Sequence, residues 1–339
     1  MTDFIVNYGM FLAKTITLIM ALLLTIGGIL LIASHGRNSA KERLDVKKIN
    51  DKYEEMAATV KAAILSKDEL KKDSKNNKLQ KKSEASQLKN NKHLPPKRIF
   101  VLKFDGDIKA SALASLREEI TAILTVATPE DEVFLNLQSG GGMVHAYGLA
   151  ASQLMRIKDK NIPLTICVDS IAASGGYMMA CVADKIIAAP FAIIGSIGVI
   201  AQLPNFHRLL KKHDIDFEQV TAGEFKRTIT MFGENTDKTR QKFKEELEEV
   251  HILFKDFIRQ HRPIVDVDRI STGEHWLATR ALELNLIDEL KTSDDYLLEQ
   301  SQNKVLYEVC YSIKQSLGAR IGGFAQNSID KIFRTQSLH

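Results

Sequence analysis

From residue 98 onward, short apolar runs alternate with longer amphipathic segments, and this alternation limits the fold more than any other feature. Four runs rich in branched and aromatic residues are typical of strands, at 98–104, 132–137, 164–168 and 185–188. Segments with a helical period lie between them, at 112–127, after residue 142 and from 174 to 182. Because strands that alternate with helices usually pair in parallel through right-handed crossovers, the sequence predicts an α/β fold.

The second half of the chain continues this pattern with less regularity. It predicts a short strand at 217–221, a long amphipathic helix at 238–260, a helix at 278–285 and a last turn or strand near 287–290. Residues 186–203 form an uncharged stretch of eighteen residues, but Pro190, Gly195 and Gly198 interrupt it. Two short buried strands joined by a turn fit this stretch better than a membrane span.

A membrane-spanning helix is predicted at the N-terminus. Residues 4–33 are almost entirely apolar, and residues 16–33 are eighteen residues without a charge. About 20 such residues in a helix cross the hydrocarbon core of a bilayer. A cleaved signal peptide would begin with basic residues, whereas Thr2 and Asp3 lead this segment. We therefore expect residues 1–36 to form an uncleaved anchor that enters the lipid bilayer through residues 4–33.

Residues 37–97 are expected to form a helical and lysine-rich linker. Ser39–Ser66 has a helical period without glycine or proline, and 67–92 is too polar to bury a core. We interpret this polar segment as a solvated tether; binding of acidic lipid or nucleic acid is the alternative, and we expect no nucleic-acid partner. The main domain is then placed at 98–295 and a C-terminal tail at 296–339.

Several classes of site are disfavoured by what the sequence lacks. Its three cysteines form neither a disulfide framework nor a metal-binding pattern, and they are expected to be small buried side chains. Neither of the common phosphate-binding glycine motifs occurs, which argues against nucleotide binding. We therefore expect no metal and no cofactor.

Three glycine-bearing turns follow predicted strands, and they are the strongest indication of a site. They are Ser139–Gly142, Ser174–Gly176 and Gly195–Gly198. Loops at the carboxyl ends of parallel strands are where α/β folds build their sites. Glycine lets the backbone approach a substrate and aims N–H groups at a developing negative charge.

Ser174 is either a helix cap or a nucleophile presented at a tight turn. A nucleophilic serine needs a base, and none of the nine histidines lies in a recognisable triad context. A lysine can serve instead if burial lowers its pKa. Lys226, in the segment Thr221–Arg227, is the candidate; the alternative is that it is a lysine on a loop surface.

These segments resemble the signal peptide peptidase A family of serine–lysine membrane peptidases. The resemblance lies in DSIAASGGY at 169–177, GSIGV at 195–199 and TAGEFKR at 221–227. It is strongest toward the SohB-type branch, through GGMVH at 141–145, YMMACVADK at 177–185, PFAIIGSIGV at 190–199 and GEHW at 273–276. The similarity covers residues 98–290, and several linked motifs occur in the same order.

The resemblance implies a ClpP/crotonase-like fold and a role for each matching residue. Ser174 matches the nucleophile, Lys226 the general base and Ser196 the hydroxyl that positions the lysine amine. Gly141 matches the glycine whose N–H helps to form the oxyanion hole, and the Gly175 N–H is a plausible second donor. Family members usually carry proline where this chain has Gly140. Proline fixes φ and glycine does not, so this chain departs from the family in the rigidity of this turn.

The expected function is that of a membrane-anchored serine endopeptidase acting on signal-peptide remnants or unfolded membrane-associated polypeptides. The family assembles rings or domes, so a homo-oligomer in a bacterial inner membrane is expected. The family's catalytic domain is generally extracytoplasmic, whereas the cations after Ala33 favour the cytoplasm. Two other classes stay open: a crotonase-type acyl-CoA enzyme on the same fold, and a non-catalytic membrane scaffold.

Overall fold

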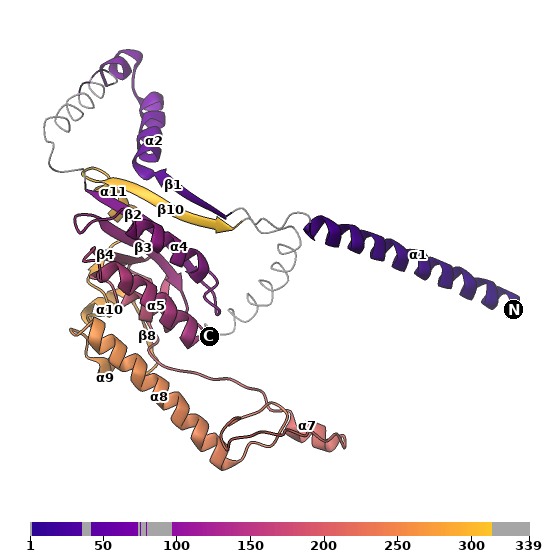
Figure 1. Ribbon diagram of the computed structural model, residues 1–339. Coiled ribbons are helices and arrows are strands. Elements are labelled where there is room, and N and C mark those ends of the chain that lie inside the picture. The colour runs from indigo at the N-terminus through magenta and orange to yellow at the C-terminus, as the bar shows by residue number, and fades with distance from the viewer. Residues whose placement is uncertain (1, 36–41, 74, 76–78, 80–96, 314–339) are drawn as a thin grey trace. The chain divides into compact units, whose positions relative to one another are not determined.

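The computed structural model describes residues 2–35, 42–73, 75, 79 and 97–313 (Figure 1). The chain divides into two compact units, residues 1–44 with 311–339 and residues 45–310. Most of the lysine-rich segment at 67–92 lies outside the described residues, so its expected role as a tether stays a prediction.

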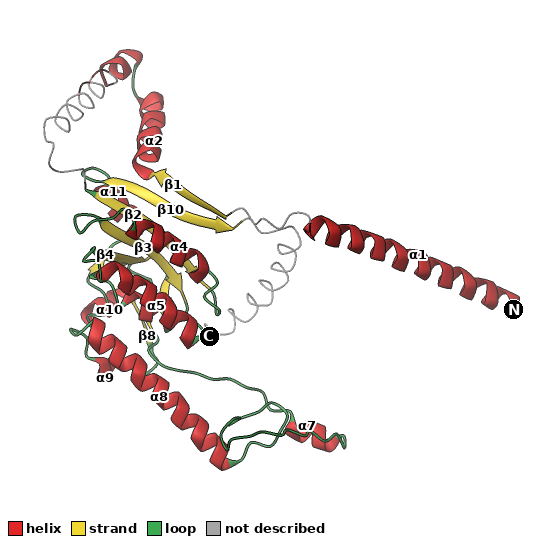
Figure 2. Ribbon diagram, viewed as in Figure 1, coloured by secondary structure: helices red, strands yellow, loops and turns green. Residues whose placement is uncertain are grey.

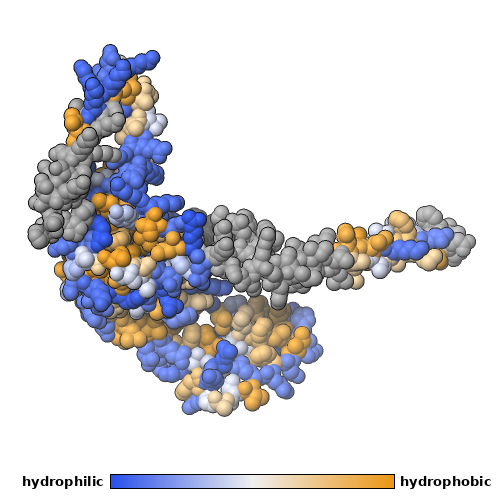
Figure 3. All heavy atoms as spheres, turned by 45° about the horizontal axis from the view of Figure 1, so that its top comes forward, coloured by the Kyte–Doolittle hydropathy of each residue, from blue (hydrophilic) through white to orange (hydrophobic). Residues whose placement is uncertain are grey.

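The N-terminal segment forms one continuous helix, α1, Thr2–His35. Within the described part of the chain, it is the helix that is long and apolar enough to cross a membrane, over Val6–Leu23. None of that window is buried, and Figure 3 shows apolar side chains on the surface of this helix. A helix satisfies its own backbone hydrogen bonds, which is what a span through hydrocarbon requires.

The second unit is built on one mixed sheet, in which the described residues form ten strands. Its main path runs β1-β10-β2-β3-β4-β6-β9; β5 pairs with β3 and β7, and β7 pairs with β8. The β7–β8 pair is antiparallel, and the pairs that join β10 through β2, β3, β4 and β6 to β9 are parallel. The strands are β1 Glu42–Lys48, β2 Arg98–Gly106, β3 Glu132–Ser139, β4 Leu164–Val168, β5 Ile171–Ala173, β6 Lys185–Ala188, β7 Ile193–Gly195, β8 His275–Leu277, β9 Glu289–Leu290 and β10 Val305–Ile313.

Helices cover the sheet, and Figure 2 shows α4 and α5 lying along one of its faces. The remaining described helices are α2 Ile49–Ile64, α4 Leu113–Leu124, α5 Val144–Lys158, α6 Gly175–Ala180, α7 His207–Lys212, α8 Asp237–His261, α9 Val267–Ile270, α10 Ala278–Glu283 and α11 Ser293–Gln300. Along β2, alternate side chains enter different cores, as the period of two in a strand requires. Phe100, Leu102 and Phe104 join the large core with α4, α5 and α6, whereas Ile99 and Val101 pack on the side of Tyr296.

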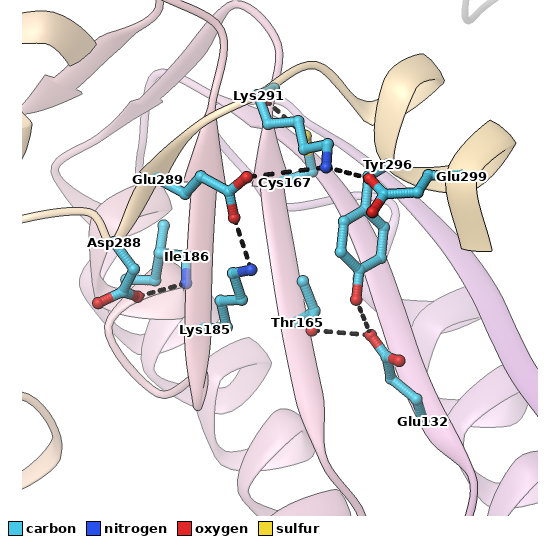
Figure 4. A network of polar contacts seen from close by, with 10 residues as sticks. All are labelled: Glu132, Thr165, Cys167, Lys185, Ile186, Asp288, Glu289, Lys291, Tyr296 and Glu299. Carbon is cyan, nitrogen blue, oxygen red and sulfur yellow. Dashed lines mark hydrogen bonds and ion pairs between the residues drawn. The ribbon is translucent and has the colours of Figure 1, made fainter.

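A network of polar contacts fastens α11 to the second face of the sheet (Figure 4). The buried carboxylate of Glu132 accepts hydrogen bonds from the Thr165 hydroxyl, the Tyr296 hydroxyl and the Lys304 ammonium. Burial and the bond to Glu132 raise the pKa of Tyr296. Because a buried carboxylate is stable only when it is paired, this network fixes α11 in register on the sheet.

Most predicted elements of the second unit are confirmed. The four predicted strands correspond to β2, β3, β4 and β6, the helix predicted at 238–260 is α8, and the one at 278–285 is α10. The uncharged stretch 186–203 contains the end of β6 and all of β7, joined by a turn, as expected.

Both ends of the described domain differ from the prediction. The helix expected at 39–66 begins only at Ile49, because residues 42–48 form β1 next to β10. Residues 305–313, expected in a C-terminal tail, form β10, which pairs with β2 from Val305 opposite Arg98. Each of these strands has its partner some 200 residues away or more, so no local pattern reveals the pairing.

The strand expected at 217–221 is absent from the described residues, which form an exposed loop there. Phe217 packs against Phe232 with 5.7 Å between ring centroids, and Phe232 stacks in turn on Phe206. The apolar residues of this segment therefore contact one another rather than a sheet.

Candidate active site

Three neighbouring parallel strands, β3, β5 and β7, bring the three glycine turns together at their carboxyl ends. Two register pairs fix the alignment: Ser139 with Ala172, and Ala173 with Gly195. Continued past the strand ends, this register places Gly141, Ser174 and Ser196 side by side. Neighbouring strands lie about 4.8 Å apart, so all three residues share one small edge of the sheet.

Ser174 has a strained backbone conformation, and its hydroxyl forms no hydrogen bond with any residue that the structure describes. Its φ is 52° and its ψ is −118°, in a region that residues with a Cβ rarely adopt. Its N–H donates to the Gly195 carbonyl over 2.8 Å, which holds the strain in place. Although Ser174 precedes α6, its side chain makes no capping hydrogen bond. The structure therefore disfavours the helix-cap interpretation, and the partly exposed hydroxyl is available for chemistry.

Gly141 lies so close to the Ser174 turn that a side chain would not fit there. A Cβ built on Gly141 would lie 2.8 Å from the Ser174 Cβ and 2.8 Å from the Gly175 nitrogen, and its φ is +86°. The Gly141 N–H, expected to point toward an oxyanion, instead donates to Ser139 Oγ over 3.0 Å. Among the described residues, the N–H groups of Gly142 and Gly175 donate to no acceptor.

Ser196 mirrors Ser174 on the neighbouring strand. Its φ is 51°, and its N–H donates to the Glu274 carbonyl over 2.7 Å. The turn is packed from outside by Trp276, since a Cβ on Gly195 would lie 2.7 Å from the indole ring. The GEHW segment thus supports the end of β7, and the Ser196 side chain is partly exposed beside the Ser174 turn.

Lys226 is not brought to Ser174 within the single chain. It lies in an exposed loop, and its backbone N–H donates to the Gly223 carbonyl. The next residue toward the N-terminus, Phe225, packs under the ammonium groups of Lys238 and Lys242 at the start of α8. The part of α8 that enters the core begins near Phe254, about 18 Å further along the helix. The structure therefore unites Gly141, Ser174, Gly175 and Ser196, and it leaves Lys226 apart.

Asp169, at the start of the DSIAASGGY segment, anchors the loop that leads to Ser174. Its carboxylate accepts from the Ser293 N–H, the Ser293 hydroxyl and the Asn136 amide, at 2.9, 2.5 and 2.8 Å. Partial burial raises the pKa of Asp169, but the bonds from Ser293 and Asn136 outweigh it, so the net pKa is lowered. Beside it, burial and the Asp169 charge raise the pKa of the Cys167 thiol, so this cysteine is held neutral and unreactive.

Two residues that sequence reasoning did not assign to the site lie directly behind it. The Ser139 hydroxyl accepts a hydrogen bond from the Gly141 N–H, and it also forms a hydrogen bond with the Tyr147 hydroxyl over 2.5 Å. Tyr147 follows the helical period of α5, which by itself indicates only a core position. Its polar end, inside an otherwise apolar face, was the one available signal, because buried tyrosine hydroxyls usually have a partner.

The chain is similar to a known peptidase family and to proteins of that family. Residues 3–154 match the family described as peptidase family S49 N-terminal, and residues 156–306 match peptidase family S49. The chain is 48% identical to the probable protease SohB of Haemophilus influenzae over 344 residues, which cover 99% of this chain and 97% of that protein. It is 49% identical to the probable protease SohB of Buchnera aphidicola subsp. Schlechtendalia chinensis over 305 residues, covering 88% and 100%.

Two solved structures are also similar. Both are variants of the 1510-N membrane-bound stomatin-specific protease, one of them in complex with a substrate peptide. They have TM-scores of 0.40 at 18% and 17% identity, and cover 61% of this chain and 86% and 80% of theirs.

The family matches define this protein as a peptidase, and its described residues form an N-terminal apolar helix and a mixed α/β sheet. More particularly, the chain belongs to peptidase family S49. The recognised family and the predicted α/β fold class are thereby confirmed.

Proposed function

We propose that this peptidase is a membrane-anchored serine endopeptidase in which Ser174 attacks the peptide carbonyl and Lys226 takes its proton. The observation that carries the proposal is the alignment of Gly141, Ser174 and Ser196 at the ends of three parallel strands. A strained serine with a free hydroxyl, beside two glycine turns with free N–H groups, is an arrangement suited to acyl transfer.

The chemistry then divides into two steps. The neutral amine of Lys226 removes the Ser174 proton, and the alkoxide forms a tetrahedral intermediate whose oxyanion is held by backbone N–H groups. We propose the N–H groups of Gly175 and Gly142 as these donors. In the turn of Gly141, the Gly142 N–H is the one left free, because the Gly141 N–H is bonded to Ser139. The leaving amine takes the proton from the lysine, and water activated by the same amine hydrolyses the acyl-enzyme. The Ser196 hydroxyl positions the amine.

Lys226 reaches Ser174, in this proposal, from a neighbouring copy of the chain. Within one chain, the loop of Lys226 packs on the N-terminal half of α8. The segment between β7 and α8, which contains this loop, also exposes large apolar side chains. Exposed apolar residues gather on it, among them Ile200, Leu203, Phe206, Val220 and Phe225. Such a surface is typical of one that another protein covers, which supports a homo-oligomer with its sites at subunit junctions.

The substrates we propose are apolar peptides, such as signal-peptide remnants or unfolded membrane-associated polypeptides. Beside the candidate oxyanion turn, three apolar side chains are exposed: Ile108 at 44%, Met143 at 42% and Val144 at 46%. The Met143 N–H donates to the Ile108 carbonyl over 2.9 Å, so the two loops form one rim. An apolar rim next to the nucleophile favours apolar side chains in the substrate.

We propose that α1 holds the protein in a bacterial inner membrane. An extracytoplasmic domain, expected from the family, and a cytoplasmic one, expected from the flanking cations, predict opposite results in one experiment. Cys310 is the exposed cysteine, whereas Cys167 and Cys181 are buried. A membrane-impermeant maleimide that labels Cys310 in spheroplasts places the domain outside the cytoplasm; labelling only after lysis places it inside.

Hydrolysis of fluorescein-labelled casein tests the proposed function. We expect the purified full-length protein to release fluorescent peptides, and we expect Ser174→Ala to reduce the rate by at least 10³-fold, as removal of a nucleophile does. Gly148→Ala is a matched control on the surface of α5, where a Cβ meets no atom within 4 Å. Equal rates for Ser174→Ala and the parent would contradict the proposal.

A further inference from the structure

Tyr147 connects three loops that meet at the candidate site. Its side chain is fully buried, and its hydroxyl donates to the Asp107 carbonyl over 2.7 Å. The same oxygen lies 2.5 Å from Ser139 Oγ. A phenol has one proton, which goes to Asp107, so the Ser139 hydroxyl must be the donor to Tyr147.

The consequence is a directed chain of hydrogen bonds from the oxyanion turn into the core. The Gly141 N–H donates to Ser139 Oγ, the Ser139 hydroxyl donates to Tyr147, and Tyr147 donates to the carbonyl of Asp107. Bonds that run in one direction polarise one another and strengthen the chain. The peptide plane of Gly141 is therefore turned inward, and the next amide, Gly142, is left unbonded among the described residues.

The ring of Tyr147 contacts the nucleophile turn as well. A Cβ on Gly175 would lie 2.5 Å from the Tyr147 Cγ, so the ring lies directly against the residue that follows Ser174. A Cβ on Gly106 would lie 2.5 Å from both Ser139 Oγ and the Tyr147 hydroxyl. No residue larger than glycine fits at these two positions while Tyr147 keeps its place.

We infer that Tyr147 is a positioning residue for the hydrolysis reaction, acting through Ser139 on the oxyanion turn and through its ring on the nucleophile turn. This inference rests on the proposed function. Gly140 gives this turn more backbone freedom than a proline would, so the orientation of its amides needs another constraint. The hydrogen-bond chain supplies that constraint without touching the substrate.

The test measures kcat and KM for labelled casein with full-length Tyr147→Phe, which keeps the ring and removes only the hydroxyl. Removing an oxyanion donor outright costs about 10²–10³ in kcat, so misplacing one should cost about tenfold, with KM within about twofold. Ser139→Ala should give the same loss, and the double variant no further loss, because both act through one chain of bonds.

Tyr296→Phe is the matched control, since it also removes a buried tyrosine hydroxyl but on the opposite face of the sheet. If Tyr147→Phe and Ser139→Ala both retain the kcat of Tyr296→Phe, the inference is wrong. Should Tyr147→Phe fail to fold, Ser139→Ala decides by the same comparison. Failure of the proposed function is distinguishable, because then Ser174→Ala would hydrolyse casein as fast as the parent.

Discussion

At the scale of single residues, the site depends on backbone conformations that only particular residues allow. Ser174 and Ser196 both carry a positive φ, and each is held by a backbone bond to a neighbouring segment, the Gly195 carbonyl or the Glu274 carbonyl. Strain of this kind costs about 1–3 kcal/mol per residue and persists only where surrounding structure enforces it. Its occurrence at two adjacent serines is what distinguishes this edge of the sheet from an ordinary set of turns.

Gly141→Ala should abolish activity while leaving the rest of the fold intact. The left-handed conformation alone costs a residue with a Cβ about 1–2 kcal/mol, and the added Cβ would lie 2.8 Å from Ser174 and Gly175. We expect casein hydrolysis to fall by at least 10²-fold, as on loss of one oxyanion donor, because the displaced turn would no longer present the Gly142 N–H. Circular dichroism and the rate of Gly148→Ala provide the controls; full activity in Gly141→Ala would show that this turn does not form the site.

The sequence predicts these residues to different degrees. Ser174, Ser196 and Gly141 stand in short motifs with glycines, whose backbone needs are local and therefore visible. The role of Tyr147 depends on the position of its hydroxyl beside Asp107 and Ser139. That position is set only by the packing of three loops, so the sequence does not reveal it. Lys226 follows from its position only as one candidate base, and its role as the base comes from the resemblance.

At the scale of elements, the buried parallel strands were predictable and the edge elements were not. The strands β3 and β4 are buried on both faces and read as continuous apolar runs, such as Val133–Leu135. By contrast, β1 is almost wholly exposed and carries mainly charged residues, so its sequence has no strand signal. Its place in the sheet follows from β10, a partner at the other end of the chain.

Tyr296→Phe should lower the free energy of unfolding by about 1–3 kcal/mol, because the buried Glu132 carboxylate loses one of its donors. Urea unfolding followed by tryptophan fluorescence measures the change. Tyr307→Phe is the matched control, since that ring stacks on Phe100 in the same sheet and its hydroxyl makes no hydrogen bond among the described residues. Equal stability of the two variants would show that the network in Figure 4 does not fasten α11.

Asp169 should make the stability of this region depend on pH in the acid range. Its folded pKa lies below the ordinary value of 3.8, so its contribution is complete above that value and is lost as the pH falls through the folded pKa. Asp169→Asn should therefore be less stable than the parent at pH 7, and the difference should shrink below about pH 4. Urea unfolding at pH 7, 5 and 3.5 measures it.

The exposed Asp216, on the loop after α7, offers the control for this pH series. We expect Asp216→Asn to differ little from the parent at all three pH values. A stability difference for Asp169→Asn that stays constant or grows as the pH falls would contradict the assigned role of the carboxylate.

At the scale of the whole molecule, one chain presents the proposed nucleophile, Ser174, beside the proposed oxyanion turns, and it holds the candidate base, Lys226, elsewhere. The exposed apolar residues around α7 and the distance along α8 are the two observations behind our proposal that the site is completed in an assembly.

Mixing two inactive variants tests this arrangement. If Lys226 acts across a subunit junction, Ser174→Ala and Lys226→Ala chains co-expressed in one cell should regain part of the parent's casein hydrolysis. In a random mixture, a quarter of the junctions join an intact serine to an intact lysine, so about 25% is expected if junctions are independent. No activity above that of either variant alone would place both residues of a working site in one chain.

Labelling with a fluorophosphonate tests the claim that Ser174 is a nucleophile activated by Lys226. The full-length protein should form one covalent adduct, which mass spectrometry of tryptic peptides should locate at Ser174. Lys226→Ala should abolish the labelling, and Lys211→Ala, a substitution of another exposed lysine, should leave it unchanged. Labelling that persists at the parent's rate in Lys226→Ala, or an adduct on another serine, would contradict the claim.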